Sequence, residues 1–111
     1  MNNEFFLQRL GIKSLNEMQQ KTAAAIREQD HIILLSATGS GKTLAFLLPV
    51  LESLDPGIDF CQALILVPSR ELALQIDSVL KKMQTGFKVT TCYGGHKREI
   101  EENNLVQPPA I

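Results

Sequence analysis

The chain has 111 residues, of which 44% are hydrophobic, and carries a formal net charge of −1 at pH 7. This length fits one small domain or part of a larger one, the apolar fraction suits a globular core, and the near-neutral charge gives no overall electrostatic sign of a nucleic-acid or membrane partner. Cys61 and Cys92 are isolated, which predicts reduced thiols in a cytoplasmic protein and excludes a disulfide framework or a cysteine metal site.

The N-terminal segment predicts two helices. Phe5–Leu10 has the pattern of a short amphipathic helix, and Gly11 is expected to end it in the left-handed conformation. A second helix is expected to begin at a cap, either Ser14 or Asn16, and to run to about Gln29. Basic residues interrupt any apolar run of the kind a signal peptide needs, and no segment is long enough to span a bilayer.

A nucleotide site is predicted next. The apolar run Ile32–Leu35 predicts a strand buried on both faces, and it leads through the glycine-rich turn Ser36–Thr43 into a helix over Lys42–Leu54. Successive backbone N–H groups of such a turn form an anion cradle at the positive end of the helix. Lys42 is expected to reach the β- and γ-phosphates, and the Thr43 hydroxyl to ligate Mg²⁺. The expected nucleotide contacts here are Ala37, Thr38, Gly39, Ser40, Gly41, Lys42 and Thr43, with Lys42 and Thr43 also serving catalysis.

The second half alternates strands and helices. Ala63–Val67 predicts a buried strand, followed by a helix over Arg70–Gln84 that Gly86 is expected to close. Lys88–Cys92 predicts another strand, and His96–Asn104 a helix. A further strand is expected to begin at the C-terminal end, at Ala110 and Ile111. This alternation predicts an α/β fold with a parallel sheet flanked by helices.

Four segments resemble motifs of the DEAD-box RNA helicase family, in the family's order and spacing. Val67–Ile76 resembles its Pro-Thr-Arg-Glu-Leu-Ala motif, with Ser69 in place of the threonine. Gly11–Gln19 looks like its Q motif, Ser36–Thr43 like its phosphate loop, and Tyr93–Gly95 like its Gly-Gly element. The resemblance implies a partial RecA-like P-loop NTPase domain, incomplete in this chain. Its parts would be the Q-motif region 5–29, the phosphate loop 36–43 and the RNA-contact motif 68–73.

The resemblance implies that Gln19 recognises adenine. A glutamine amide carries both an acceptor and a donor, so Gln19 can pair with an adenine edge that offers the complementary groups. The alternative is an ordinary glutamine on a helix surface. Leu15 stands where the family usually has proline, and Phe5 and Phe6 lie too near Gln19 to serve as the family's upstream aromatic, so both are expected in the core.

The resemblance also implies contacts to the backbone of single-stranded RNA. Ser69 can cap the following helix, whose free N–H groups suit a phosphate, and Arg70 would add charge. The alternative for Arg70 is a structural ion pair. Gly94 and Gly95 would let a second backbone segment approach closely. The implied RNA contacts are Pro68, Ser69, Arg70, Gly94 and Gly95, whereas Lys97 and Arg98 are expected on a solvated helix face.

Parts of the family's ATPase site are missing from this sequence. The family takes its Mg²⁺-binding carboxylate from an Asp-Glu-Ala-Asp motif and its arginine finger from a second RecA-like domain, and the sequence contains neither. The chain is therefore expected to be the N-terminal part of the first RecA-like domain of an ATP-dependent RNA helicase, which would bind ATP and Mg²⁺ without turnover. Its exposed sheet edges would favour an oligomer or a strand swap.

Two alternatives remain open for the function. A DNA helicase or translocase of the same superfamily would share the phosphate loop, although the Pro-Ser-Arg-Glu-Leu-Ala segment argues against it. A non-catalytic nucleotide-binding interaction module would use the same loop without coupling it to unwinding. The expected partners of the favoured function are RNA, contacted through its backbone, and the second RecA-like domain of the same protein, with no membrane involved.

Overall fold

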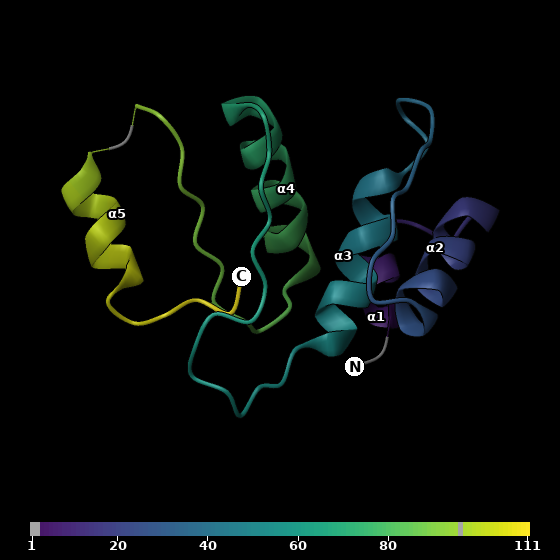
Figure 1. Ribbon diagram of the computed structural model, residues 1–111, viewed down its shortest axis with the longest axis horizontal. Coiled ribbons are helices and arrows are strands. Elements are labelled where there is room, and N and C mark those ends of the chain that lie inside the picture. The colour runs from purple at the N-terminus through teal and green to yellow at the C-terminus, as the bar shows by residue number, and fades with distance from the viewer. Residues whose placement is uncertain (1–2, 96) are drawn as a thin grey trace. The chain divides into compact units, whose positions relative to one another are not determined.

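The computed structural model describes residues 3–95 and 97–111, which form five helices and no strand (Figure 1). The chain divides into two units, Met1–Ser53 and Leu54–Ile111, each described separately below. None of the helices in the described residues is long and apolar enough to cross a membrane. The first residue of the expected helix His96–Asn104 lies outside the described residues.

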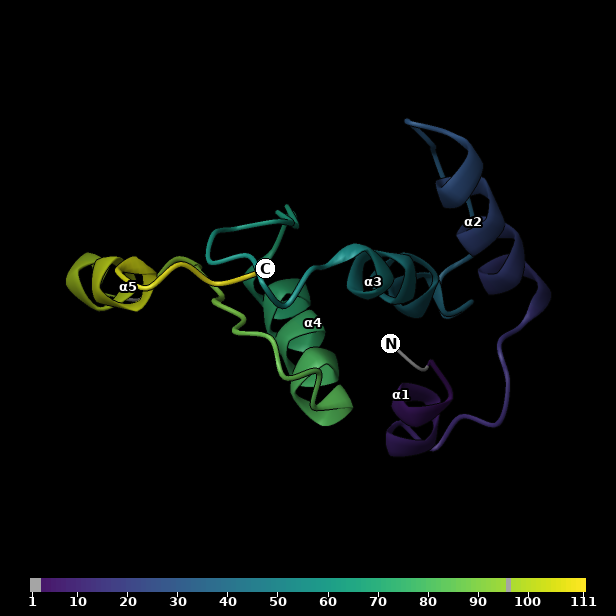
Figure 2. The same ribbon diagram turned by 90° about the horizontal axis from the view of Figure 1, so that it is seen from below.

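Three helices make up the first unit: α1 (Asn3–Arg9), α2 (Glu17–Glu28) and α3 (Lys42–Ser53). Two predicted helix boundaries are confirmed. Gly11, which follows α1, has a φ of 71°, and Asn16 caps the N-terminus of α2. α2 packs against α3, and the two lie side by side in Figures 1 and 2. Most of the buried residues of this unit belong to α3: the set is Phe6, Leu7, Gln19, Thr22, Leu44, Ala45, Leu47, Leu48, Pro49 and Leu51.

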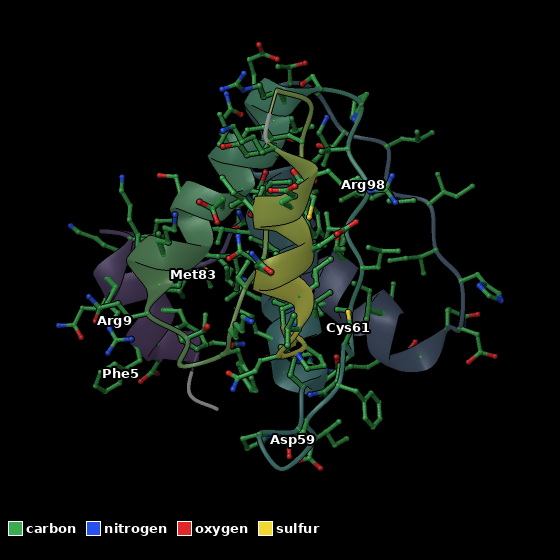
Figure 3. The ribbon with its side chains drawn as sticks, turned by 90° about the vertical axis from the view of Figure 1, so that its left-hand side faces the viewer. Phe5, Arg9, Asp59, Cys61, Met83 and Arg98 are labelled. Carbon is green, nitrogen blue, oxygen red and sulfur yellow. The ribbon has the colours of Figure 1, made fainter. Side chains whose placement is uncertain are left out.

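The expectation for the two N-terminal phenylalanines is half wrong. Phe6 is buried, but Phe5 is 57% exposed. The Arg9 guanidinium carbon lies 5.1 Å from the centroid of the Phe5 ring, and both side chains project from α1 in Figure 3. Adjacent positions on a helix point in directions about 100° apart, so only one of the two rings can face the core.

Glu52, near the end of α3, ties all three helices of this unit together. Its carboxylate accepts hydrogen bonds from Asn3 of α1 and, at 2.9 Å, from Arg27 of α2. Burial raises the pKa of this carboxyl group, but the hydrogen bonds from Arg27 and Asn3 outweigh burial and hold the pKa below its ordinary value of 4.5. The ionised form is therefore the one that stabilises the folded unit.

Acid is expected to remove this contribution. The pKa of Glu52 is lower in the folded chain than in the unfolded chain, where it is 4.5. The stabilisation is therefore fully present above pH 4.5 and is lost as the pH falls through the pKa of the folded chain. Glu52→Gln is expected to lower the free energy of unfolding by up to about 1 kcal/mol at neutral pH. The difference from wild type should shrink in urea unfolding at acidic pH. A difference that stays constant across this pH range would contradict the assignment.

The second unit contains α4 (Arg70–Met83) and α5 (Arg98–Leu105). Ser69 caps α4 through its hydroxyl, which accepts a hydrogen bond from the Leu72 amide at 3.2 Å. The expected closure by Gly86 is wrong: Gln84 ends α4 in the left-handed conformation with a φ of 50°. Gly86 also has a positive φ, but it belongs to the turn that follows. The buried residues of this unit are Leu54, Ala73, Ile76, Leu80, Met83, Pro109, Ala110 and Ile111.

The expected strands are extended segments in the described residues and form no regular ladder. In the first unit, the segment 32–35 is not buried on both faces as predicted, because Ile33 and Leu35 are each 89% exposed. In the second unit, Ala110 accepts hydrogen bonds from the amides of Gln62 and Ala63 and donates one to Lys88, and Thr90 donates to Ile111. These bonds hold 110–111 between the two other extended segments. A strand needs a paired neighbour along its length, which the described residues provide only at these few positions.

Candidate nucleotide and RNA sites

The phosphate loop spans Ser36–Thr43, directly before and into the first turn of α3. Its tip is a turn in which the Ser40 amide donates to the Ala37 carbonyl at 3.2 Å, and both of its glycines have positive φ angles, 79° at Gly39 and 90° at Gly41. Only glycine adopts this backbone conformation without strain. The loop leads into the N-terminus of α3, where the first backbone N–H groups have no partner within the helix.

Lys42 closes the loop from the helix side. Its ammonium group donates a hydrogen bond to the Ser36 carbonyl at 2.7 Å. Ser36, which takes the place of the first glycine of the phosphate-loop pattern, also bonds through its hydroxyl to the hydroxyl of Ser40. Both contacts join the beginning of the loop to its end. The lysine side chain thus lies along the loop and bonds back to its first residue.

Gln19 of α2 contacts this loop directly. Its side-chain Nε2 donates to the Gly41 carbonyl at 3.1 Å, and its Oε1 accepts from the Asn16 amide at 2.9 Å. The side chain is only 6% exposed, so it is not an ordinary glutamine of the helix surface. A Cβ atom at Gly41 would lie 2.5 Å from Gln19 Nε2, so any other residue there would require the end of the Gln19 side chain to shift, in addition to straining the backbone. The structure thus brings Gln19 and the phosphate loop together in one unit.

Carboxylates for Mg²⁺ do not gather in the described residues, where no group of three or more His, Cys, Asp or Glu residues could hold a metal ion. Thr43 lies half-buried in the first turn of α3. Asp77 has structural partners instead: it accepts from the Thr91 hydroxyl at 2.9 Å and pairs with Lys81 at 2.7 Å, which raises the pKa of Lys81. Of the described residues at this site, the Thr43 hydroxyl is suited to be one ligand of Mg²⁺, and no cluster of carboxylates supplies the others.

The second unit brings together part of the expected RNA site. The Arg70 guanidinium carbon lies 4.9 Å from the centroid of the Tyr93 ring, and a Cβ atom at Gly95 would lie 3.2 Å from Arg70 Nη1. Gly95 also has a φ of 93°. Ser69, Arg70 and Gly95 therefore meet at the N-terminus of α4. Among the described residues no atom lies within 4 Å of the corresponding position at Gly94, and the atom near Gly95 belongs to a side chain, so the expected approach of a second backbone segment is found at neither glycine.

Removing the cap of α4 is expected to weaken the second unit. Ser69→Ala deletes the hydroxyl that accepts the Leu72 amide, and the loss of a serine cap costs about 1 kcal/mol. Ser69→Thr keeps an oxygen at the same place and serves as the matched control. Thermal unfolding checks the difference, with a midpoint several degrees lower for the alanine variant only. Equal midpoints for both variants would show that the cap contributes nothing.

Three contacts were not expected from the sequence. Asn16 was a candidate cap, but its second hydrogen bond, from Nδ2 to the Ser40 carbonyl at 3.0 Å, was not foreseen. The Ser36–Ser40 contact and the stacking of Tyr93 on Arg70 were also missed. The available signals were the serine at a glycine position and the aromatic residue directly before two glycines. The expected solvent exposure of Arg98 is found: its pair with Glu102 is 91% and 62% exposed.

Comparisons with known proteins agree with these motifs. The model of the DEAD/DEAH box helicase family matches residues 16–111. The chain is 36% identical over 99 residues to "DEAD-box ATP-dependent RNA helicase CshC" of Bacillus cereus, covering 86% of this chain and 25% of that protein. It is 34% identical over 105 residues to "ATP-dependent RNA helicase DeaD" of Escherichia coli K12, covering 92% and 17%. It is 37% identical over 110 residues to "Probable ATP-dependent RNA helicase ddx27" of Dictyostelium discoideum, covering 95% and 14%. The chain thus spans a quarter or less of the length of these relatives.

Proposed function

The chain belongs to the DEAD/DEAH box helicase family, and from this premise we propose that it is the nucleotide-binding, N-terminal part of an ATP-dependent RNA helicase. The observation that carries the proposal is the phosphate loop, with Gly41 at a φ of 90°, Lys42 at the start of α3 and Gln19 bonded to the loop from α2. The family implies a RecA-like fold. In the full-length protein, we propose that further residues complete the parallel sheet of that fold and supply the Asp-Glu-Ala-Asp motif and the second domain.

The nucleotide is proposed to be ATP with Mg²⁺. Backbone N–H groups of residues 37–43 and the Lys42 ammonium group would hold the phosphates, and the Thr43 hydroxyl would contribute one ligand to Mg²⁺. The amide of Gln19 has two N–H donors and two acceptor lone pairs, of which its contacts with Gly41 and Asn16 use one each. One donor and one acceptor remain, and these complement the N7 acceptor and N6 donor of adenine.

Nucleotide competition tests this proposal. The 111-residue chain is expected to bind ADP more tightly than GDP, measured by displacement of a fluorescent ADP analogue. Gln19→Met, which keeps the length of the side chain but removes its polar groups, should bring the two affinities closer together. If the wild-type chain binds ADP and GDP equally, Gln19 does not select adenine. If it binds neither, the nucleotide site itself is rejected.

The RNA contact is proposed for the N-terminus of α4. Arg70, held beside Tyr93 and Gly95, would meet a backbone phosphate together with the first amides of the helix, and Pro68 and Ser69 would line the same end. Such contacts follow the backbone and do not read base sequence. Arg70→Ala is expected to weaken the binding of a short single-stranded RNA several-fold, with Arg98→Ala as an exposed control. DNA of the same sequence binding as tightly as RNA would favour the DNA helicase alternative.

By itself the chain is proposed to associate and not to hydrolyse ATP. Apolar residues of the extended segments are largely exposed, at 78% for Leu64 and 84% for Leu66 as well as for the segment 32–35. Unpaired extended segments of this kind pair with other chains. Light scattering is expected to give a mass above 12.3 kDa, and a cooperatively folding monomer would contradict this. Release of phosphate from ATP by the isolated chain would contradict the binding-only role.

The exposed cysteines Cys61 and Cys92 form no disulfide, which suits the proposed reducing, cytoplasmic location.

A further inference from the structure

We propose that Tyr93 is a positioning residue for the binding of RNA, because its ring holds the Arg70 guanidinium at the N-terminus of α4. The inference rests on the RNA contact proposed above for Arg70. The guanidinium carbon lies 4.9 Å from the centroid of the Tyr93 ring, within the range over which a cation is attracted to an aromatic face. The contact joins the extended segment that ends at Tyr93 to the first residue of α4.

The charge of Arg70 is not held by an acidic partner. Among residues 3–95 and 97–111, no carboxylate forms an ion pair with its guanidinium, so the structural ion pair considered as an alternative for this residue is not found there. Arg70 is also exposed, and an exposed arginine side chain samples many rotamers. Holding it in one of them costs conformational entropy. The contact with the Tyr93 ring reduces this freedom without neutralising the charge.

Tyr93 is itself fixed by the two helices of its unit. Its backbone amide donates a hydrogen bond to the carboxylate of Glu101 in α5 at 3.1 Å. Its side chain is half-buried and lines a hollow together with Leu74 and Asp77 of α4. The backbone of Tyr93 is therefore held from α5, and its ring is bordered by α4. A ring held in this way can orient the side chain that rests on it.

Gly95 leaves room for the guanidinium beside the ring. A Cβ atom at this position would lie 3.2 Å from Arg70 Nη1, closer than ordinary van der Waals contact. The N–H donors of a guanidinium lie in its plane, and the contacts with Tyr93 and Gly95 limit how that plane can turn. The first amides of α4, which have no partner within the helix, begin at the same residue. A phosphate there meets donors whose directions are already restricted, which lowers the entropy cost of binding.

The experiment is a double-mutant cycle in the full 111-residue chain, with fluorescein-labelled oligouridylate as the probe. Tyr93→Leu keeps an apolar side chain but removes the aromatic face, and it is expected to raise the Kd about threefold. Tyr93→Phe keeps the face and should bind as wild type does. In a chain that already carries Arg70→Ala, Tyr93→Leu should cause no further loss, because Tyr93 acts through Arg70.

Two results of this cycle would overturn the proposal. Wild-type affinity in Tyr93→Leu would show that the ring does not matter for binding. An equal rise in Kd with and without Arg70 would mean that Tyr93 contacts the RNA directly, as by stacking on a base. Thermal unfolding of each variant shows whether the chain still folds.

A second measurement tests the contact without any RNA. Protons that lie over an aromatic face resonate upfield in NMR spectra, so the side-chain protons of Arg70 are expected upfield in wild type and Tyr93→Phe and at ordinary shifts in Tyr93→Leu. Ordinary shifts in wild type would overturn the positioning role even if the chain binds RNA. Upfield shifts in a chain that binds no RNA would instead reject the proposed RNA site and leave the contact a structural one. The two failures are therefore distinguishable.

Discussion

Replacing Lys42 with alanine is expected to abolish detectable ADP binding by the 111-residue chain. The ammonium group lies at the start of α3 and bonds to the Ser36 carbonyl at 2.7 Å, so it is placed along the loop that would hold the phosphates. Its removal deletes the one cationic side chain of the loop. Loss of a charge-assisted contact of this kind costs about 3 kcal/mol, which corresponds to roughly a hundredfold in Kd.

Calorimetry with ADP measures this effect, and two variants make it interpretable. Lys21→Ala removes an exposed lysine from α2, where it pairs with Glu17 at 2.6 Å, and is expected to leave the ADP affinity unchanged. Lys42→Arg keeps the charge and so tests for the shape of the ammonium group. Thermal unfolding of Lys42→Ala should show that the chain still folds. An ADP affinity equal to that of wild type would remove Lys42 from the site and, with it, the main support for the phosphate loop.

Gly41→Ala is expected to produce the largest loss of stability among single substitutions in the loop. The residue has a φ of 90°, and a Cβ atom there would lie 2.5 Å from Gln19 Nε2. The backbone strain costs about 1–2 kcal/mol, and displacing a packed side chain adds about 1–3 kcal/mol. Gln19 would have to leave the Gly41 carbonyl, so the variant should lose ADP binding as well.

Gly39→Ala provides the matched control, since this glycine has a similar φ of 79° but no atom within 4 Å of an added Cβ. Gly39→Ala therefore introduces similar backbone strain but no steric clash with Gln19. In urea unfolding, the free energy of unfolding of Gly41→Ala should therefore be lower than that of Gly39→Ala, and the difference should equal the packing cost alone. Equal free energies of unfolding would mean that Gln19 moves aside freely and does not hold the loop.

The helices could be predicted from the sequence because their signals are local. A cap at Asn16, a serine at Ser69 and a glycine after α1 each set a boundary through groups only a few residues away. The error at the end of α4 has the same origin. Two residues there take positive φ angles, Gln84 and Gly86, and a sequence pattern favours the glycine although the chain uses the first of them as the cap.

The strands were the poorer part of the prediction, for a physical reason. An apolar run such as 32–35 states a preference for burial, but hydrogen bonding to a neighbour along the sheet decides whether it becomes a strand. Among the described residues that neighbour is absent for 32–35, and present only at the C-terminal pair 110–111 for the other segments. The same apolar side chains therefore remain exposed.

By itself, the sequence determined the family of this protein and the ends of most of its helices, and it predicted the position of a phosphate loop. These depend on short motifs and on caps, in which each residue acts on its near neighbours. Only the tertiary structure decided that Asn16, the cap of α2, and Gln19 within α2 donate hydrogen bonds to the carbonyls of Ser40 and Gly41. These hydrogen bonds join residues more than twenty positions apart, and their geometry depends on the packing of α2 against α3. A local sequence pattern cannot predict hydrogen bonds between residues so far apart in the chain.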